Sequence, residues 1–94
     1  MVSADWDLIP EYMHPALRRY IELGIAPGDF LRSVLCNDLR SAVWYADHTN
    51  LRYLPSYVNF LSDAPAECWG SHKKYLDWIH QGGLSGREKK WEAA

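Results

Sequence analysis

Chemically suggestive side chains gather in residues 68–74, which read CWGSHKK. Ser71 suits a helix N-cap, and the free N–H groups and dipole at a helix N-terminus attract an anion. Lysines in the first helical turn oppose that dipole, so the pair that follows is unfavourable unless an anion compensates it. An aromatic ring just before the cap could stack on an attached base. The pattern predicts a phosphate or carboxylate site formed by Gly70, Ser71, Lys73 and Lys74, with Trp69 stacking.

A simpler interpretation of this segment stays open. Ser71 would be an ordinary N-cap, and Trp69 would fill the core between the last two helices. Serine is so common at helix N-caps that the general frequency favours this alternative.

A second candidate site lies around Asn37 and Asp38. At 3.6 residues per turn, Asp38 falls on the apolar side of the helix expected there, and an isolated carboxylate on such a face would have a raised pKa. Alternatively, Asp38 caps a second helical segment or bonds Tyr45 or an arginine, since buried polar groups are usually satisfied. The polar strip of the same helix carries Arg40 and the large indole of Trp44. We predict that these side chains contribute to ligand binding: Asn37, Asp38, Arg40 and Trp44.

Metal and catalytic motifs give little support for an enzyme. The possible metal ligands are His14, His48, His72, His80, Cys36 and Cys68. Their spacing offers no complete set of four zinc ligands. HExxH, Walker and GxGxxG patterns and a nucleophile elbow are absent from the sequence. We therefore expect no metal, no cofactor and no enzymatic activity.

The elements that must position these residues read as helices. Residues 28–46 predict a central helix, because its apolar residues cover roughly two thirds of the circumference. Asn and Asp in mid-helix compete for backbone hydrogen bonds, so two segments at about 28–36 and 38–46 are an alternative. The residues on the apolar arc are Phe30, Leu31, Val34, Leu35, Leu39, Ala42, Val43 and Ala46.

Three further helices are expected at about residues 15–23, 54–62 and 72–80. Pro15 and Pro55 lie near the first turns of the first two, Gly24 and Gly82 follow the first and the last, and Ser71 suits the N-cap of the last. No segment has the alternation of a strand, so the fold class is all-α, a compact four-helix domain covering residues 1–94. An N-terminal arm at residues 1–9 and a flexible tail at residues 84–94 complete it.

Composition excludes some partners and suggests others. The net charge of -2 gives no general attraction to duplex nucleic acid. No stretch approaches the ~20 apolar residues of a membrane span, and two cysteines make no disulfide framework, which predicts a soluble cytoplasmic protein. Five tryptophans and six tyrosines in 94 residues are many for one small core. We expect this excess to serve a homo-oligomer interface or a ligand surface.

The chain resembles a family of small, uncharacterised phage and prophage proteins. The family pattern is YIExGIxPGxFLxxVLxNDLxxAxxxADxxN, followed by an alanine-proline and an aromatic-glycine-serine before the last helix. The segments that match cover about residues 15–83 and are Tyr20-Ile21-Glu22, Gly24-Ile25, Pro27-Gly28, Phe30-Leu31, Val34-Leu35, Asn37-Asp38-Leu39, Ala46-Asp47 and Asn50. The resemblance implies an accessory gene of a phage, acting in the host cytoplasm, for which countering a bacterial defence system is one job. It supplies no catalytic residues.

These observations favour a non-catalytic binding protein of a phage. It would sequester a phosphate-containing signal of the nucleotide type, or it would block a host defence protein. Dependence on Trp69 and Lys73 would indicate the small molecule, whereas dependence on scattered surface residues would indicate the protein target. The alternative is a homo-oligomeric structural or assembly adaptor that associates through Trp6, Trp44 and Trp91.

Overall fold

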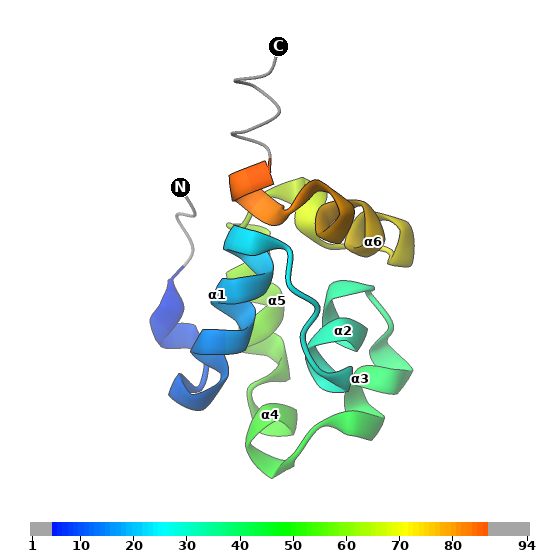
Figure 1. The fold of residues 1–94 in the computed structure, drawn as a ribbon. Helices are drawn as coiled ribbons and strands as arrows, with labels where there is room; N and C mark the ends of the chain where they lie inside the picture. Colours follow the sequence, from blue (N-terminus) through cyan, green and yellow to red (C-terminus); the bar gives the residue numbers. More distant parts are fainter. Residues whose placement is uncertain (1–4, 87–94) are drawn as a thin grey trace.

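The computed structural model of the chain describes residues 5–86, and all regular secondary structure in that range is helical (Figure 1). The predicted all-α fold class is therefore confirmed. The α-helices are α1 His14–Leu23, α2 Asp29–Leu35, α3 Leu39–Tyr45, α4 His48–Arg52, α5 Leu54–Ser62 and α6 His72–Gln81. The 3-10 helices are η1 Trp6–Leu8, η2 Glu11–Met13 and η3 Ala66–Cys68.

The predicted count of four helices is not confirmed, because the central region is divided. No single helix spans residues 28–46: α2 ends at Leu35 and α3 begins at Leu39, as in the two-segment alternative. Asn37 takes a left-handed conformation with φ 60°, which asparagine tolerates better than most residues. Asp38 then caps α3, since its carboxylate accepts a hydrogen bond from Ser41 N at 3.2 Å. The chain therefore changes direction between the two helices.

The other helix ends follow the expected local rules. Pro15 lies in the first turn of α1, and Gly24 closes that helix in the left-handed region with φ 69°. Ser71 caps α6 by accepting a hydrogen bond from Lys74 N. The polar residues 47–50 suggest a break in the sequence, but they begin the short helix α4, because the Asp47 carboxylate accepts from Asn50 N at 2.7 Å.

The core is rich in aromatic rings, and three of them donate hydrogen bonds within the fold. Tyr20 donates its hydroxyl proton to the carbonyl of Cys68, and Trp78 Nε1 donates to the carbonyl of Tyr20 at 3.0 Å. Tyr57 donates to Asn50 Oδ1 at 2.6 Å. Burial raises the pKa of both tyrosines well above the usual range. The first two bonds join α1 to η3 and α6, and the third joins α5 to α4.

Around these rings, α2 contributes the largest set of buried residues of any helix. Its buried residues are Phe30, Leu31, Ser33, Val34 and Leu35. Figure 1 shows α2 enclosed by its neighbours, with α6 crossing above it and α3 beside it. The helix is thus buried on more than one face, as the wide apolar arc predicted.

The N-terminal segment lies on the body of the same chain. The indole of Trp6 packs edge-on against Phe60, with 4.7 Å between ring centroids, and the Arg18 guanidinium lies 4.4 Å above the indole. This indole is therefore engaged within the fold. At the other end, residues 83–86 are helical and Leu84 packs against the core. The rest of the predicted tail, including Trp91, lies outside the described residues.

None of the helices in residues 5–86 combines the length and apolar character needed to cross a membrane.

Candidate functional site

A polar cavity of about 530 Å³ opens where the end of α2 and the starts of α3 and α6 meet. Six side chains line it: Arg32, Ser33, Cys36, Asp38, Ser41 and His72. The fold brings these residues together from three helices. The break at Asn37 is what turns the start of α3 toward the end of α2.

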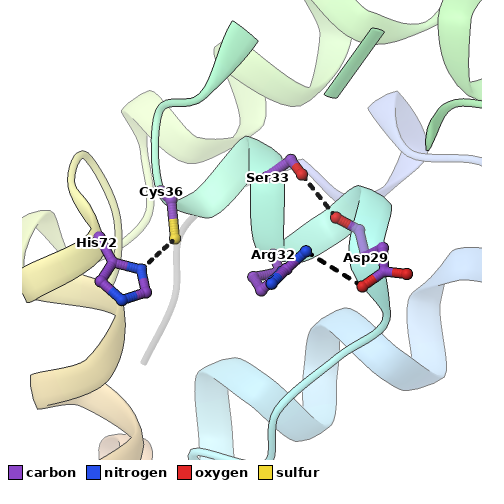
Figure 2. Close-up of polar contacts among 5 residues, drawn as sticks. All are labelled: Asp29, Arg32, Ser33, Cys36 and His72. Atoms are coloured by element: carbon purple, nitrogen blue, oxygen red, sulfur yellow. Dashed lines mark hydrogen bonds and ion pairs between the residues drawn. The ribbon is translucent and has the colours of Figure 1, made fainter. Parts of the chain in front are cut away.

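A cysteine and a histidine face each other across this cavity. Cys36 is the C-cap residue of α2, and His72 is the first residue of α6. The sulfur lies 3.6 Å from Nδ1 of the imidazole, within reach of a thiol hydrogen bond (Figure 2). A thiol and a base at this distance are the elements of a proton-transfer pair.

Burial keeps the Cys36 sulfur protonated at rest. It raises the pKa of the thiol above its usual value, the Arg32 guanidinium opposes this rise, and the Asp38 carboxylate adds a smaller increase. The position at the C-terminal end of α2 also disfavours a thiolate, because that end of a helix carries partial negative charge. The resting cavity therefore holds a thiol beside an imidazole.

The remaining lining of the cavity is held by hydrogen bonds within α2. Arg32 Nη2 lies 3.2 Å from Asp29 Oδ1, and Ser33 Oγ donates to the carbonyl of Asp29 at 2.8 Å (Figure 2). The ion pair is exposed, so it holds the guanidinium weakly. Ser33 is buried and its hydroxyl is engaged, whereas Arg32 is available to a ligand.

Asp38 behaves differently from the expectation of a raised pKa on an apolar face. It is exposed, and its hydrogen bonds with Ser41 lower the pKa of its carboxyl below the usual value. The prediction assumed one continuous helix, and the left-handed Asn37 removes Asp38 from that helical arc. The carboxylate is therefore ionised at neutral pH and caps α3, which is the structural alternative given above.

A second, apolar groove of about 60 Å³ lies next to Asp38. It runs between α2, α3, α5 and the loop before α6. The lining residues are Val34, Asn37, Asp38, Leu39, Ala42, Leu54, Val58 and Trp69. Asp38 thus lines both hollows, and it is the charged residue of the apolar groove.

The predicted anion site before α6 uses most of its polar groups within the fold. Gly70 N donates to the carbonyl of Leu35 at 2.8 Å, and Ser71 caps the helix. Lys73 Nζ lies 2.6 Å from Asp77 Oδ2, and Lys74 Nζ lies 3.4 Å from the carbonyl of Ala66. An intrahelical carboxylate thus compensates one of the two lysines.

The other predicted site residues fall into two groups. Trp69, Asn37 and Asp38 come together along the apolar groove, although they belonged to two separate candidate sites in the sequence. Arg40 and Trp44 point outward from α3, and Trp44 is 82% exposed. Neither side chain lines the polar cavity or the apolar groove, and their part in ligand binding stays a prediction.

The pairing of Cys36 with His72 was missed by sequence reasoning. Both residues were considered as metal ligands, but their separation of 36 positions carries no motif. Within residues 5–86, no group of three or more histidine, cysteine or acidic side chains could hold a metal ion. The signal for the pair lies in tertiary structure, where the loop before α6 bonds the end of α2.

Comparisons with protein-family models, with curated proteins and with solved structures found no match for this chain.

Proposed function

We propose that this chain is a non-catalytic phage accessory protein that acts in the host cytoplasm by covering a surface of a bacterial defence protein. The phage origin rests on the motif resemblance in residues 15–83. The choice of a protein partner rests on the apolar groove between α3 and α5 and on the exposed apolar residues beside it.

Exposed apolar side chains surround the groove. Leu39 is 69% exposed and Val58 is 48% exposed, although both line it, and Val43 lies one turn after Leu39 on α3. Grouped apolar side chains on the surface of a small domain mark interaction sites more often than scattered ones do. The volume of about 60 Å³ suits one buried side chain of a partner and is too small for a nucleotide.

The charge at the groove also favours a protein partner over a phosphate-containing signal. The Asp38 carboxylate is ionised and is the charged side chain of the groove, so it repels a phosphate there. A protein segment with an apolar anchor and a neighbouring lysine or arginine is complementary to this arrangement. The nucleotide-type ligand at Trp69, Ser71 and Lys73 stays a prediction with less support.

A second copy of the chain is the competing occupant of the groove. Trp6, one of the three tryptophans expected to mediate self-association, packs on Phe60 of its own chain. Trp44 keeps its exposed indole on α3, the helix that also carries the groove residue Leu39. The homo-oligomeric adaptor therefore remains the alternative, and it predicts a dimer that depends on this surface.

The test compares matched substitutions of exposed leucines. Leu39→Gln lies in the groove, and Leu23→Gln lies at the end of α1, where the leucine is 50% exposed. Each variant is expressed in a panel of bacterial strains that carry one defence system each, and plaques of a sensitive phage are counted. In a strain where the natural chain restores plaques, we expect Leu39→Gln to lose that activity and Leu23→Gln to keep it.

Three further results decide between the alternatives. Full activity of a Leu39→Gln, Val58→Gln double variant would contradict the groove. Loss of activity in Lys73→Glu, with the groove variants active, would favour the phosphate-containing signal. A dimer in sedimentation analysis that becomes monomeric with Leu39→Gln would identify the groove as a subunit interface.

A further inference from the structure

We infer that Cys36 and His72 form a thiol–disulfide exchange site, which accepts a small disulfide carrying both ammonium and carboxylate groups. The inference is independent of the proposed partner surface. It rests on the pair of side chains in the polar cavity, on the contrast between the two cysteines and on the opposite charges beside the sulfur.

The two cysteines differ in their access to solvent. Cys36 is half-buried and lines the cavity of about 530 Å³, whereas Cys68 is fully buried in the core. A cavity of this volume is in the range of small-molecule sites, roughly 300–1,000 Å³. A dissolved disulfide can therefore reach Cys36 in the folded chain, and it reaches Cys68 only when the core opens.

The imidazole supplies the base that the protonated thiol needs. Nδ1 of His72 lies 3.6 Å from the sulfur and accepts the thiol proton as the sulfur attacks. The new bond joins Cys36 to one sulfur of the small disulfide, and the bond between its two sulfurs breaks. The leaving thiolate takes up the proton from the imidazolium. Cys36 is oxidised and the small disulfide is reduced, so one mixed disulfide and one free thiol result.

The surroundings of the pair define the charges that influence this transfer. Arg32 approaches from α2, Asp38 from the start of α3, Tyr75 from α6 and Tyr20 from α1. Because His72 is the first residue of α6, the partially positive end of that helix lies beside the sulfur and offsets the negative end of α2. A thiolate that forms as the proton moves to His72 therefore lies beside the partially positive end of α6 and the Arg32 guanidinium.

The charges that line the cavity indicate the chemistry of the ligand. The Arg32 guanidinium is a cation in the cavity wall, and its exposed ion pair with Asp29 can exchange for a ligand. The Asp38 side chain is an ionised carboxylate in the same wall. A carboxylate of the ligand can pair with the guanidinium while its ammonium group pairs with Asp38. Disulfides of the amino-acid type carry both groups, and neutral disulfides carry neither.

The experiment measures mixed-disulfide formation by mass spectrometry on the folded chain, with cystine and with the neutral hydroxyethyl disulfide as probes. We expect one addition per chain, and peptide mapping places it on Cys36. Cys36→Ser removes the addition, while Cys68→Ala keeps it. The reaction of the natural chain with cystine is faster than that of its urea-unfolded form at the same pH.

Variants of the neighbours test the assigned roles. His72→Gln lowers the rate by about a hundredfold or more, the loss expected when a general base is removed. It also changes the dependence of the rate on pH. Arg32→Gln and Asp38→Asn reduce the preference for cystine over the neutral probe. Circular dichroism of each variant separates these effects from loss of folding.

Several results would overturn the inference. These are addition to Cys68 ahead of Cys36, a folded chain that reacts no faster than the unfolded one, and an unchanged rate and pH profile in a folded His72→Gln variant.

Discussion

The interior around Tyr20, Tyr57 and Trp78 and the surface of α3 use aromatic residues in opposite ways. The three interior rings are almost fully buried, and each donates a hydrogen bond within the fold. Trp44, on α3, exposes most of its indole to solvent. The comparison separates residues that stabilise the fold from residues that are free to meet a partner.

The difference is also visible among aliphatic residues. Leu31 and Leu35 on α2 are buried, whereas Leu39 and Val43 on α3 are exposed. A fold that needed these two side chains for stability would bury them, since each buried aliphatic side chain contributes roughly 1.5–3 kcal/mol. Their exposure leaves them for binding, and the predictions below test whether the two regions are as separate as they look.

The largest effect is expected from removal of an interior ring. Trp78→Ala empties a buried site and deletes the hydrogen bond to the Tyr20 carbonyl, so it should lower the free energy of unfolding by about 3–5 kcal/mol. Trp44→Ala, at an exposed position, should change it by about 0.5 kcal/mol or less. Urea unfolding of both variants measures the contrast, and similar losses would contradict the division into two regions.

A smaller loss is expected when a single buried hydrogen bond is removed. Tyr57→Phe leaves Asn50 Oδ1 without its 2.6 Å partner in a buried position, which should cost about 1–3 kcal/mol. Tyr45→Phe is the matched control, because that ring is half exposed on α3. Thermal unfolding of the pair measures the difference, and a destabilised Tyr45→Phe would show that α3 carries more of the fold than its exposure indicates.

The stability of the fold is expected to depend on pH through the exposed carboxylates that cap α3 and α4. Hydrogen bonds with Ser41 and with Tyr12 lower the pKa values of Asp38 and Asp47 below 3.8. A carboxyl with a lowered pKa in the folded chain stabilises it above the unfolded value, and this stabilisation disappears as the pH falls through the folded value. The melting temperature should therefore decline on acidification, starting near the ordinary aspartate pKa.

Asp38→Asn sharpens that experiment. Asparagine caps a helix about as well as aspartate but does not titrate. The variant should keep its stability at neutral pH and show a shallower decline in acid than the natural chain. An identical acid profile would mean that the pKa of Asp38 is not lowered by the fold.

The smallest effect is expected at the exposed pair on α6. Lys73 and Asp77 are in contact, but both side chains are largely exposed, so solvent screens the pair. Lys73→Ala should leave the melting temperature unchanged within measurement error. A clear loss would show that the start of α6 depends on this lysine.

The sequence predicted the parts of this fold that depend on local chemistry. Pro15, Gly24 and Ser71 occupy the helix start, helix end and N-cap expected for them. The direction of α3 was predicted incorrectly by the single-helix interpretation, which placed Leu39 and Val43 on the buried arc. One left-handed residue, Asn37, changes the orientation of everything after it, and its conformation depends on tertiary contacts.

For the candidate sites too, the sequence predicted local features but not contacts between distant segments. Ser71 was identified as a cap from its type alone, because capping involves groups three residues apart. The polar cavity joins Cys36 with His72, and the groove joins Asn37 with Trp69. These are contacts between distant segments, and residue types cannot specify them without the packing of α6 on α2.

The contact between Gly24 and Gly83 has a consequence for how tolerance to mutation should be interpreted. A Cβ at Gly24 would lie 2.7 Å from the backbone nitrogen of Gly83, and a Cβ at Gly83 would lie 2.6 Å from that of Gly24. Both residues also have positive φ, so no side chain is accommodated at either place. A saturation scan would find two intolerant positions that contribute nothing to either hollow. Loss of function at these two positions would reflect failed folding and not failed binding. Binding residues can be identified only at positions where a substitution leaves the fold intact.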